Sequence, residues 1–472
     1  MPNEIIDKLK EAGDYAARLC HGFDNEIFIS HNEVSTIRIA TNEIIESKTT
    51  LDHGLGIRIA IGQKLGFASS GSLDKESIQK TVEMAKIIAH KSVEDKHFKG
   101  FAEPHKSNNI NVNKNLFALT EEQLNDYAAR IVKTAADSNA PIHRVNSRIS
   151  GSIELVKEYC FIQNSLGVNV DDVSGAIQSN ITAEIIERGN TAAGIGWYVG
   201  TDPTKFSPEQ ITEEALSMAL KSVNPSVVHP GNYTIIFEAA AMSDILQLLL
   251  SAVSAPQIDY GLSFFKDDLN QFVATDEFNL IDDGRHPDGN GSKSVDDEGT
   301  PTQRTEIIFN GTLKHFIFDK YYGDKLKFNT TGNGFRLRDR TGRAHNSKPY
   351  PHASNFILEN GPYDKDNLIS ETRKGILIPR IWYTYPLNPQ LGDFSTTTRG
   401  SAFLIENGQI VKSLDKIRIF DNIKKMITTA KIANDQKFAV NWGAGCGLAS
   451  PTVAFEDVKV SAYDEKLEIA NK

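Results

Sequence analysis

The sequence predicts an α+β fold, in which an N-terminal α+β domain with antiparallel sheets precedes a β-rich C-terminal domain. Strand-like stretches occur in runs between helices, instead of alternating with them one by one, which favours antiparallel sheets. The segment 224–232 (NPSVVHPGN) holds two prolines and a glycine and marks the best domain boundary. Beyond it, Asn-Gly pairs at 310–311 and 407–408 indicate tight β-hairpins. We therefore expect one domain over residues 1–225 and a second over residues 232–472.

The first domain shows the order helix, strands, helix twice. The first set runs from an amphipathic helix at 2–19 to a helix that begins after Asp74. Its expected strands are short and comprise Ile27–Ser30, Val34–Thr41, Ile44–Thr50 and a hairpin over 56–69. The second set runs from a capping box at 120–123, through strands between 145 and 198, to a capping box at 207–210. This order predicts two similar halves, although no repeated sequence accompanies it.

In the second domain, Tyr233–Phe237 has the pattern of a buried strand and leads into a helix over 238–253. The segment 282–305 has no apolar periodicity and is rich in carboxylates and glycines, so we expect a long loop of the kind that usually carries a function. Thr452–Val460 alternates cleanly and predicts a final edge or barrel strand.

Composition excludes several classes of protein. The net charge of −10 argues against a nucleic-acid-binding surface, because contacts with phosphates dominate such affinity. The three cysteines are odd in number and far apart, which disfavours a disulfide framework and favours a cytoplasmic location. No apolar run approaches the roughly 20 residues that a membrane-spanning helix needs.

The acidic loop admits two interpretations besides solvated carboxylates. Asp296, Asp297 and Glu298 could hold Arg304 and cap backbone N–H groups, and this structural role is preferred. A calcium loop that begins at Asp288 would need glutamate at its twelfth position, which Gly299 occupies. The same acidic residues and Arg304 are also candidates for substrate binding.

A second candidate region follows the glycine-rich TTGNG at 330–334, which contains Asn333. Arg336 opens a set of four arginines that also includes Arg338, Arg340 and Arg343. Such a set could hold a phosphate or a peptide carboxylate in bidentate fashion, so Asn333 and Arg336 are substrate-binding candidates. The interleaved Asp339 favours internal ion pairs instead. TTGNG lacks the lysine and hydroxyl of a P-loop, and no GxSxG nucleophile motif occurs.

The junction of the buried strand and the next helix reads FEAAAM, from Phe237 to Met242. A zinc hydrolase would need two histidines about one helical turn apart, with a glutamate beside the first as general base. Only Glu238 is of the right type. Phe237 cannot bind zinc, and the thioether of Met242 is a poor zinc ligand. No confident catalytic residue emerges from this degenerate motif.

Several motifs together resemble the TldD/PmbA family, and they are densest from residue 233 onward. They are GIR at 56–58, DDEGTPT at 296–302 followed by Asn310-Gly311, TGN at 331–333 and SPT at 450–452. The chain is most similar to the PmbA branch, which is also called TldE and was long labelled a modulator of DNA gyrase. The resemblance implies an N-terminal α+β domain and a β-rich C-terminal domain.

The resemblance also implies a function. TldD members carry HExxxH and act as zinc peptidases inside a heterodimer. Here Phe237 and Met242 stand where the two histidines would be, and Glu238 matches the glutamate. A family zinc ligand is a cysteine in a Gly-x-Cys-Gly setting near the C-terminus; Cys446 lies in a similar setting and is interpreted as structural.

We therefore expect a non-catalytic subunit without a cofactor of its own, with zinc bound in a TldD-like metalloprotease partner and peptides as substrate. A homodimer is a further expected assembly. The alternatives are a stand-alone regulatory protein of the gyrase-modulator type and an active peptidase with an atypical metal site.

Overall fold

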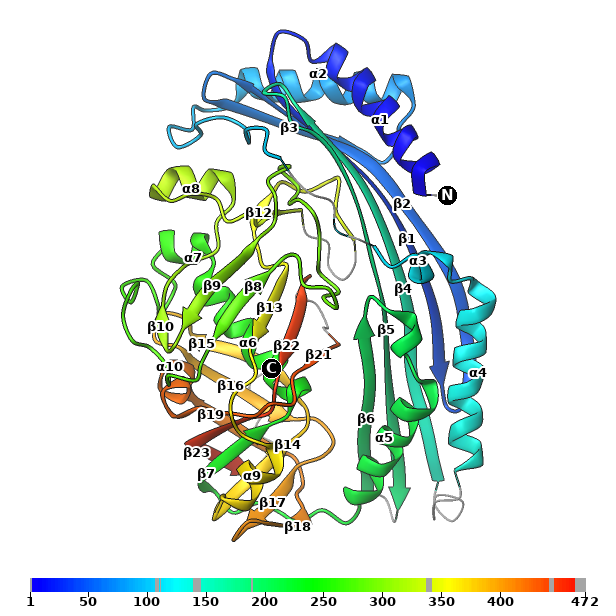
Figure 1. Cartoon of the computed structure of the whole chain (residues 1–472), viewed down its shortest axis with the longest axis vertical. Helices are drawn as coiled ribbons and strands as arrows, with labels where there is room; N and C mark the ends of the chain where they lie inside the picture. The colour runs from blue at the N-terminus through cyan, green and yellow to red at the C-terminus, as the bar shows by residue number, and fades with distance from the viewer. Residues whose placement is uncertain are drawn as a thin grey trace.

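The computed structural model describes residues 2–106, 110, 112–138, 146–187, 190–336, 342–440 and 445–462. The N-terminal half forms one six-stranded antiparallel sheet in the order β3-β2-β1-β4-β5-β6. Its strands are β1 (Asp24–Ala40), β2 (Glu43–Ile61), β3 (Lys64–Ser70), β4 (Asn146–Asn164), β5 (Asn169–Glu187) and β6 (Asn190–Gly200). This long sheet curves around the C-terminal half of the molecule (Figure 1).

The two predicted halves are present in the topology of this sheet. In the first, α1 (Pro2–Leu19) precedes β1–β3 and α2 (Lys75–Lys91) follows them. In the second, α3 (Lys114–Ala118) and α4 (Glu121–Asp137) precede β4–β6, and α5 (Pro208–Lys221) follows them. Because β1 pairs with β4, the two three-stranded units lie side by side and meet at the centre of the sheet.

The prediction of several short strands between residues 27 and 50 is wrong. β1 and β2 form one continuous antiparallel ladder from Asp24↔Ala60 to Ala40↔Glu43. The hairpin turns at Thr41 and Asn42, both of which have left-handed backbone angles (φ 50° and 67°), as a tight two-residue turn requires. Side chains at 43–53 are mostly exposed, so the hydrophobic alternation fades there while the backbone pairing continues.

The two faces of the N-terminal sheet have different neighbours. Ile27 and Ile29 belong to a core shared with α1 and α2, whereas Phe28 belongs to a cluster that includes Val295 of the acidic loop. Successive side chains of a strand point to opposite faces, so the helices cover one face and the C-terminal half covers the other.

The C-terminal half is β-rich, as predicted, and its two main sheets share a core with a central helix. One sheet has the order β10-β9-β8-β13-β22-β21 and the other has the order β15-β16-β19-β23-β7-β14-β17-β18, with β20 paired to β23. Helix α6 (Ala239–Val253) packs against residues of both sheets. The strands are β7 (Gly231–Phe237), β8 (Leu280–Asp283), β9 (Arg304–Phe309), β10 (Thr312–Leu313), β13 (Asn355–Leu358), β14 (Lys374–Ile378), β15 (Ile381–Asn388), β16 (Asp393–Thr398), β17 (Phe403–Glu406), β18 (Gln409–Ser413), β19 (Ile417–Asn422), β20 (Lys431–Ile432), β21 (Lys437–Ala439), β22 (Gly447–Ser450) and β23 (Val453–Ala462). A small pair is formed by β11 (Gly334–Phe335) and β12 (Tyr350–Pro351), and the other helices are α7 (Ala255–Asp259), α8 (Lys320–Leu326), α9 (Lys365–Ser370) and α10 (Ile423–Met426).

The last strand is interior, which corrects the prediction of an edge or barrel strand. β23 lies between β19 and β7 in the larger sheet. Its pairing with β7 shifts register between Phe455 and Val458, where Asp457 takes a left-handed backbone conformation (φ 58°). At this irregularity two exposed residues, Glu456 and Asp457, follow one another between buried neighbours.

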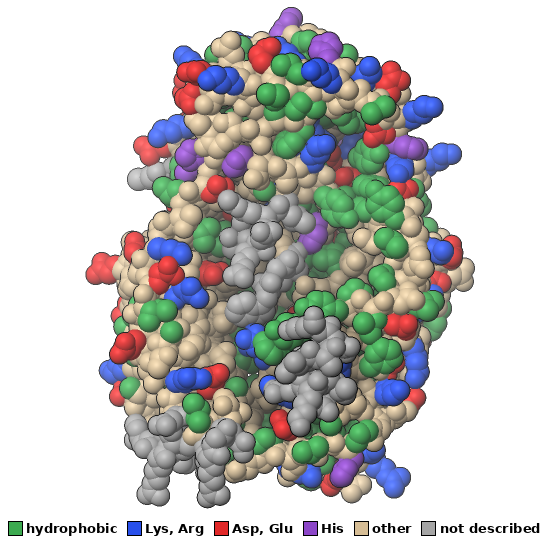
Figure 2. All heavy atoms as spheres, turned by 180° about the vertical axis from the view of Figure 1, so that it is seen from behind, with side chains coloured by type: hydrophobic (Ala, Val, Ile, Leu, Met, Phe, Trp, Pro, Cys, Tyr) green, Lys and Arg blue, Asp and Glu red, His purple; other side chains and the backbone are tan. Residues whose placement is uncertain are grey.

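No helix in the described part of the chain is both long and apolar enough to cross a membrane. The face seen in Figure 2 carries acidic and basic side chains scattered among each other, with hydrophobic patches toward its middle. The described side chains on that face form no continuous basic field of the kind that binds nucleic acid.

Candidate functional site

The predicted acidic loop lies between β8 and β9, and its carboxylates at Asp296, Asp297 and Glu298 are buried. Asp296 and Asp297 are 0% exposed and Glu298 is 2% exposed. The solvated interpretation is therefore wrong for these three residues. Burial of a carboxylate is tolerated when donors and cations surround it, and here both the loop and the N-terminal sheet supply them.

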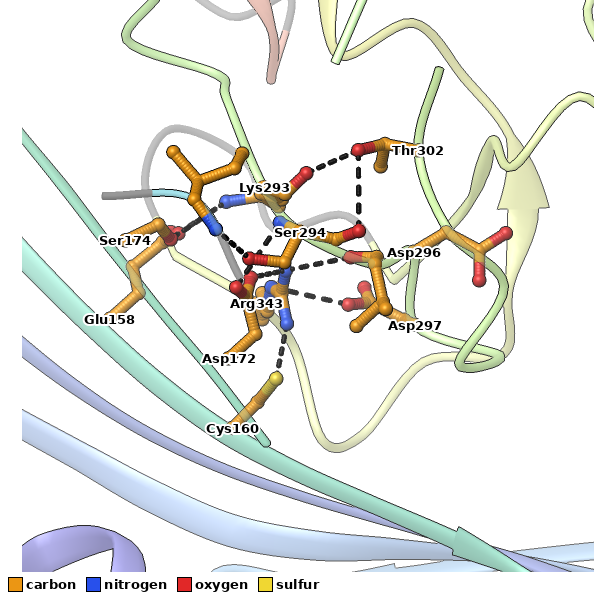
Figure 3. A network of polar contacts seen from close by, with 12 residues as sticks. Glu158, Cys160, Asp172, Ser174, Lys293, Ser294, Asp296, Asp297, Thr302 and Arg343 are labelled. Carbon is orange, nitrogen blue, oxygen red and sulfur yellow. Dashed lines mark hydrogen bonds and ion pairs between the residues drawn. The ribbon is translucent and has the colours of Figure 1, made fainter. Parts of the chain in front are cut away.

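Asp297 belongs to a network, centred on Arg343, that joins the loop to β4 and β5 (Figure 3). Its carboxylate accepts the backbone N–H of Arg336 (2.5 Å) and faces Nε of Arg343 (3.2 Å). Arg343 also donates to Asp172 of β5 (2.6 Å) and contacts the Cys160 thiol of β4. Burial raises the pKa of Asp297, and Arg343 opposes that rise.

A second set of contacts joins the loop to β1 and β2. Arg58 of β2 donates to Glu298 (3.0 Å) and, through two nitrogens, to Glu26 of β1 (2.5 and 2.8 Å). Arg336 reaches the same Glu26 at 2.5 Å, and both of these side chains are fully buried. The guanidinium groups of Arg58 and Arg336 hold the pKa of Glu26 below its usual value against the effect of burial.

Asp296 orders the loop itself. Its carboxylate accepts backbone N–H groups from Glu298 (3.0 Å), Thr300 (2.9 Å) and Gly334 (2.9 Å). Burial and the neighbouring Glu298 raise its pKa well above the usual value. Asn333 donates to Asp282 (2.6 Å) and to the carbonyl of His352 (2.9 Å), which fixes TTGNG against β8.

Arg304 does not join this cluster, which corrects the predicted pairing with Asp296–Glu298. It begins β9, and its exposed side chain donates to Glu306 (3.1 Å) and Glu359 (2.9 Å) at the surface. The acidic cluster is instead balanced by Arg58, Arg336 and Arg343. Arg338 and Arg340 fall outside the described residues. Asp288, with which the calcium loop considered above would begin, forms an ion pair with Lys205 at the surface (2.8 Å).

The degenerate motif lies at the end of β7 and the start of α6. Phe237 and Met242 are 0% exposed and belong to the central core, where Phe237 lies edge-on to Phe455 at 6.1 Å. Glu238 is the residue before the first turn of α6, and its carboxylate forms an ion pair with Lys365 of α9. It borders a groove of about 920 Å³ that both halves of the molecule line.

The residues at this junction do not fit a zinc ion. A phenylalanine and a thioether stand where ligands would be needed, and the one carboxylate is bound to an ammonium group. Cys446 borders a different, smaller cavity of about 90 Å³ with Arg343 and Ser354. Burial raises the pKa of the Cys446 thiol well above its usual value, which disfavours the thiolate that zinc requires. Among the described residues, no three His, Cys, Asp or Glu side chains are grouped so as to hold a metal.

Sequence reasoning missed most partners of the acidic loop. Glu26, Glu158, Asp172 and Lys293 gave no signal, because isolated charges in alternating strands resemble an ordinary solvated face. Arg58 was part of the GIR motif, but nothing in the sequence indicated its contact with Glu298. Lys365, the partner of Glu238, lies 127 positions further along the chain.

Comparison with known proteins agrees with this architecture. A model of the PmbA/TldA metallopeptidase C-terminal domain matches residues 230–462, and a model of domain 1 of the same group matches residues 26–89. The chain belongs to the PmbA/TldD family.

Relatives match over nearly the whole length. The chain is 25% identical over 453 residues to the metalloprotease TldD homolog of Buchnera aphidicola subsp. Acyrthosiphon pisum, which covers 89% of both chains. It is 23% identical over 434 residues to the metalloprotease PmbA of Escherichia coli O157:H7, again with 89% of each chain covered.

Two solved structures share the fold of this family member. The TldE structure from Thermococcus kodakarensis superposes with a TM-score of 0.86 at 22% identity, over 96% of this chain and 100% of that one. A Thermotoga maritima protein described as a "putative modulator of a DNA gyrase" superposes with a TM-score of 0.83 at 21% identity, over 96% and 100%. The family membership and the α+β fold expected from the sequence are thus confirmed.

Proposed function

We propose that this PmbA/TldD family member is a non-catalytic subunit of a TldD-type zinc metalloprotease system that acts on peptides or partly unfolded small proteins. The observation that carries the proposal is the state of the degenerate motif. Phe237 and Met242 are packed into the core, and Glu238 is held by Lys365. In this proposal the zinc belongs to a TldD-like partner, and this chain holds none.

The environment of Glu238 supports a structural role. A general base must reach the proton of a water that attacks the substrate, and a metal normally polarises that water. Glu238 is instead paired with the ammonium group of Lys365, with the Glu238 side chain 16% exposed. No described ligand set stands beside it to polarise a water.

The groove beside Glu238 supports a role in handling extended chains. Its lining includes Trp197 of the N-terminal half and Phe403, Ile410 and Lys437 of the C-terminal half. A groove with apolar and charged walls suits an unfolded segment that carries mixed side chains. Relatives described as metalloproteases support the peptide as the substrate class.

The test uses the purified full-length chain and the TldD-like protein of the same cell. Metal analysis of this chain should find far less than one zinc per molecule. Peptidase activity should be absent from this chain alone and should increase when the two proteins are mixed. Light scattering should show a complex of the two proteins at micromolar concentration. A stable complex of this kind is expected to bury an interface of more than about 1,000 Å².

A Glu238→Gln variant separates the roles of this chain and its partner. The mixed pair should retain its peptidase activity, because Glu238 is not the base in this proposal. Loss of activity in the pair together with about one zinc per chain would instead indicate a peptidase with an atypical metal site. Two separate species with a fully active partner would favour a stand-alone regulatory protein.

Location and assembly complete the proposal. The acidic composition and the spacing of the cysteines favour the cytoplasm. We expect the C-terminal half to supply most of the interface, because the family motifs are densest there. Without the partner, a homodimer through the same surface is the expected assembly.

A further inference from the structure

A second cavity, of about 430 Å³, lies on one face of α6 next to the groove that Glu238 borders. Asp244, Gln247, Leu248 and Ser251 form that face, at the spacing of neighbouring turns of a helix. β15 forms the opposite wall, and Trp197 of β6 lines both this cavity and the groove. Its volume falls within the range of about 300–1,000 Å³ that is typical of small-ligand sites.

Cationic groups outnumber carboxylates in this cavity. The charged residues among its described lining are Asp244, Arg380 and Arg399. Arg380 is only 7% exposed, and burial together with Arg399 lowers its pKa to about 10. Burial raises the pKa of Asp244 to about 7, so near neutral pH this carboxylate is partly protonated. The cavity lining therefore carries more positive than negative charge, which favours an anionic ligand.

The aromatic wall of the cavity shows the backbone strain that is common at ligand sites. Tyr383 has a left-handed backbone conformation (φ 51°), which is rare for a bulky side chain. The pairing of β15 with β16 shifts register between Trp382 and Tyr385, on either side of it. The Trp382 ring carries the Arg399 guanidinium at 4.5 Å from its centroid and lies 4.3 Å from the Tyr383 ring. An aromatic surface therefore lies directly beside the cations.

We infer that this cavity binds the carboxylate of a ligand whose adjoining side chain is apolar or aromatic, such as the C-terminal residue of a peptide that lies in the neighbouring groove. Guanidinium groups bind carboxylates through paired, charge-assisted hydrogen bonds. The adjoining side chain would pack against Trp382 and Tyr383. The inference rests on the proposed function only in taking the ligand to be a peptide; the preference for a carboxylate stands on the cavity alone.

The test measures binding to the purified full-length chain by tryptophan fluorescence, because Trp197 and Trp382 line the cavity. The probe is an acetylated tripeptide of two alanines and a terminal phenylalanine, with either a free or an amidated C-terminus. The free acid should bind about tenfold or more tightly than the amide, as expected for one charge-assisted pair. A third probe, amidated and with glutamate in the middle position, separates a terminal carboxylate from a side-chain carboxylate.

Two variants report on the charges. Arg399→Gln removes an exposed cation from the rim, and Gln247→Glu adds a carboxylate to a half-buried position of α6, so neither should prevent folding. Both should abolish the preference for the free acid. Arg418→Gln is the matched control, because Arg418 is an exposed arginine of the same sheet that bonds Ser395 and does not line the cavity. It should leave the preference unchanged.

Equal binding of acid and amide, or a preference that survives both variants, would overturn the inference. Equal binding of the glutamate probe and the free acid would overturn its assignment to a C-terminal residue. None of these readouts needs the partner or its peptidase activity. A failure of the proposed subunit role and a failure of this site would therefore be seen in different experiments.

Discussion

Arg336 and Glu26 lie 310 positions apart in the sequence, and their side chains form an ion pair at 2.5 Å from which water is fully excluded. The pair joins the end of the TTGNG segment to the first strand of the N-terminal sheet. Its desolvation is compensated by Arg58 on the same carboxylate and by the Phe28 ring, whose centroid lies 4.7 Å from the Arg336 guanidinium carbon. The two halves of the molecule are thus held together by charge as well as by apolar packing.

Removing Arg336 should destabilise the protein strongly. An Arg336→Gln variant leaves part of the Glu26 charge buried without a partner, and breaking such a pair costs about 3–5 kcal/mol. The matched control is Arg304→Gln, whose arginine is about equally well paired but exposed, and which should cost about 1 kcal/mol or less. Urea unfolding measures both. Equal losses of unfolding free energy for the two variants would show that the buried ion pair stabilises the protein no more than an exposed one.

Asp297 should act in stability and not in catalysis. Asp297→Ala removes the acceptor of the Arg336 N–H and the anion that faces Arg343, and we expect a loss of about 1–3 kcal/mol in the free energy of unfolding. Asp288→Ala in the same loop removes only a surface pair with Lys205 and serves as the control. An Asp297 variant with an unchanged melting temperature that blocks peptidase activity of the mixed pair would instead place the loop in the active site.

Gly299 should be required for close contact with the N-terminal sheet. It has φ +85°, and a Cβ there would lie 2.5 Å from Cγ1 of Val168. Gly22 has nearly the same backbone angle (φ +87°) but open space around it. Gly22→Ala therefore measures the backbone strain alone, about 1 kcal/mol, and Gly299→Ala should cost at least about 1 kcal/mol more. Thermal unfolding compares them, and equal losses would rule out the steric contribution.

Stability should fall as the pH rises from about 4 to 8. Burial and the neighbouring Glu298 raise the pKa of Asp319 to about 8, against about 3.9 in an unfolded chain. Between these values the folded protein keeps a proton that the unfolded chain releases, so stability that is complete at low pH is lost as the pH approaches 8.

An Asp319→Asn variant isolates this effect. Asparagine should preserve the cap of α8, in which the side chain accepts the Tyr322 N–H at 2.7 Å. The variant should lose part of the pH dependence between pH 5 and 8, with a gain of at least about 1 kcal/mol at pH 8. Urea unfolding at several pH values gives the two curves. Parallel curves for variant and native protein would contradict the assignment to Asp319.

Local signals in the sequence predicted many helices and strands well. Features that depend on contacts between distant parts of the chain could not be predicted from such signals. The helix at 2–19, the cap at Asp74, the Thr120–Gln123 capping box and the buried strand before Glu238 all follow from periodicity and capping chemistry. The lengths of β1 and β2 could not be predicted in this way, because the outer halves of these strands pair through the backbone while their side chains face solvent.

The sequence predicted the acidic loop but not the burial of its carboxylates at 296–298. The composition of 282–305 indicated a loop, yet the same carboxylates suit a solvated loop and a buried one. What decides between them is whether cations arrive from elsewhere in the fold. Arg58, which contacts Glu298, lies 240 residues upstream of it. Arg343, which contacts Asp297, lies 46 residues downstream of it. No local pattern encodes that meeting, and the assignment of Arg304 as partner was wrong for this reason.

The distribution of charge across the interface has a consequence for a severed chain. Glu26, Glu158 and Asp172 lie on the sheet, while Arg336, Lys293 and Arg343 come to them from the C-terminal half. A protease site inserted at the exposed Val227 would cut the covalent link between the two fragments and leave these pairs untouched. Because the Arg336–Glu26 and Arg343–Asp172 pairs are shielded from water and ions, the cleaved molecule should still migrate as one particle in gel filtration, even at high salt. The two new chain ends at the cut would be free, while the two fragments would remain associated.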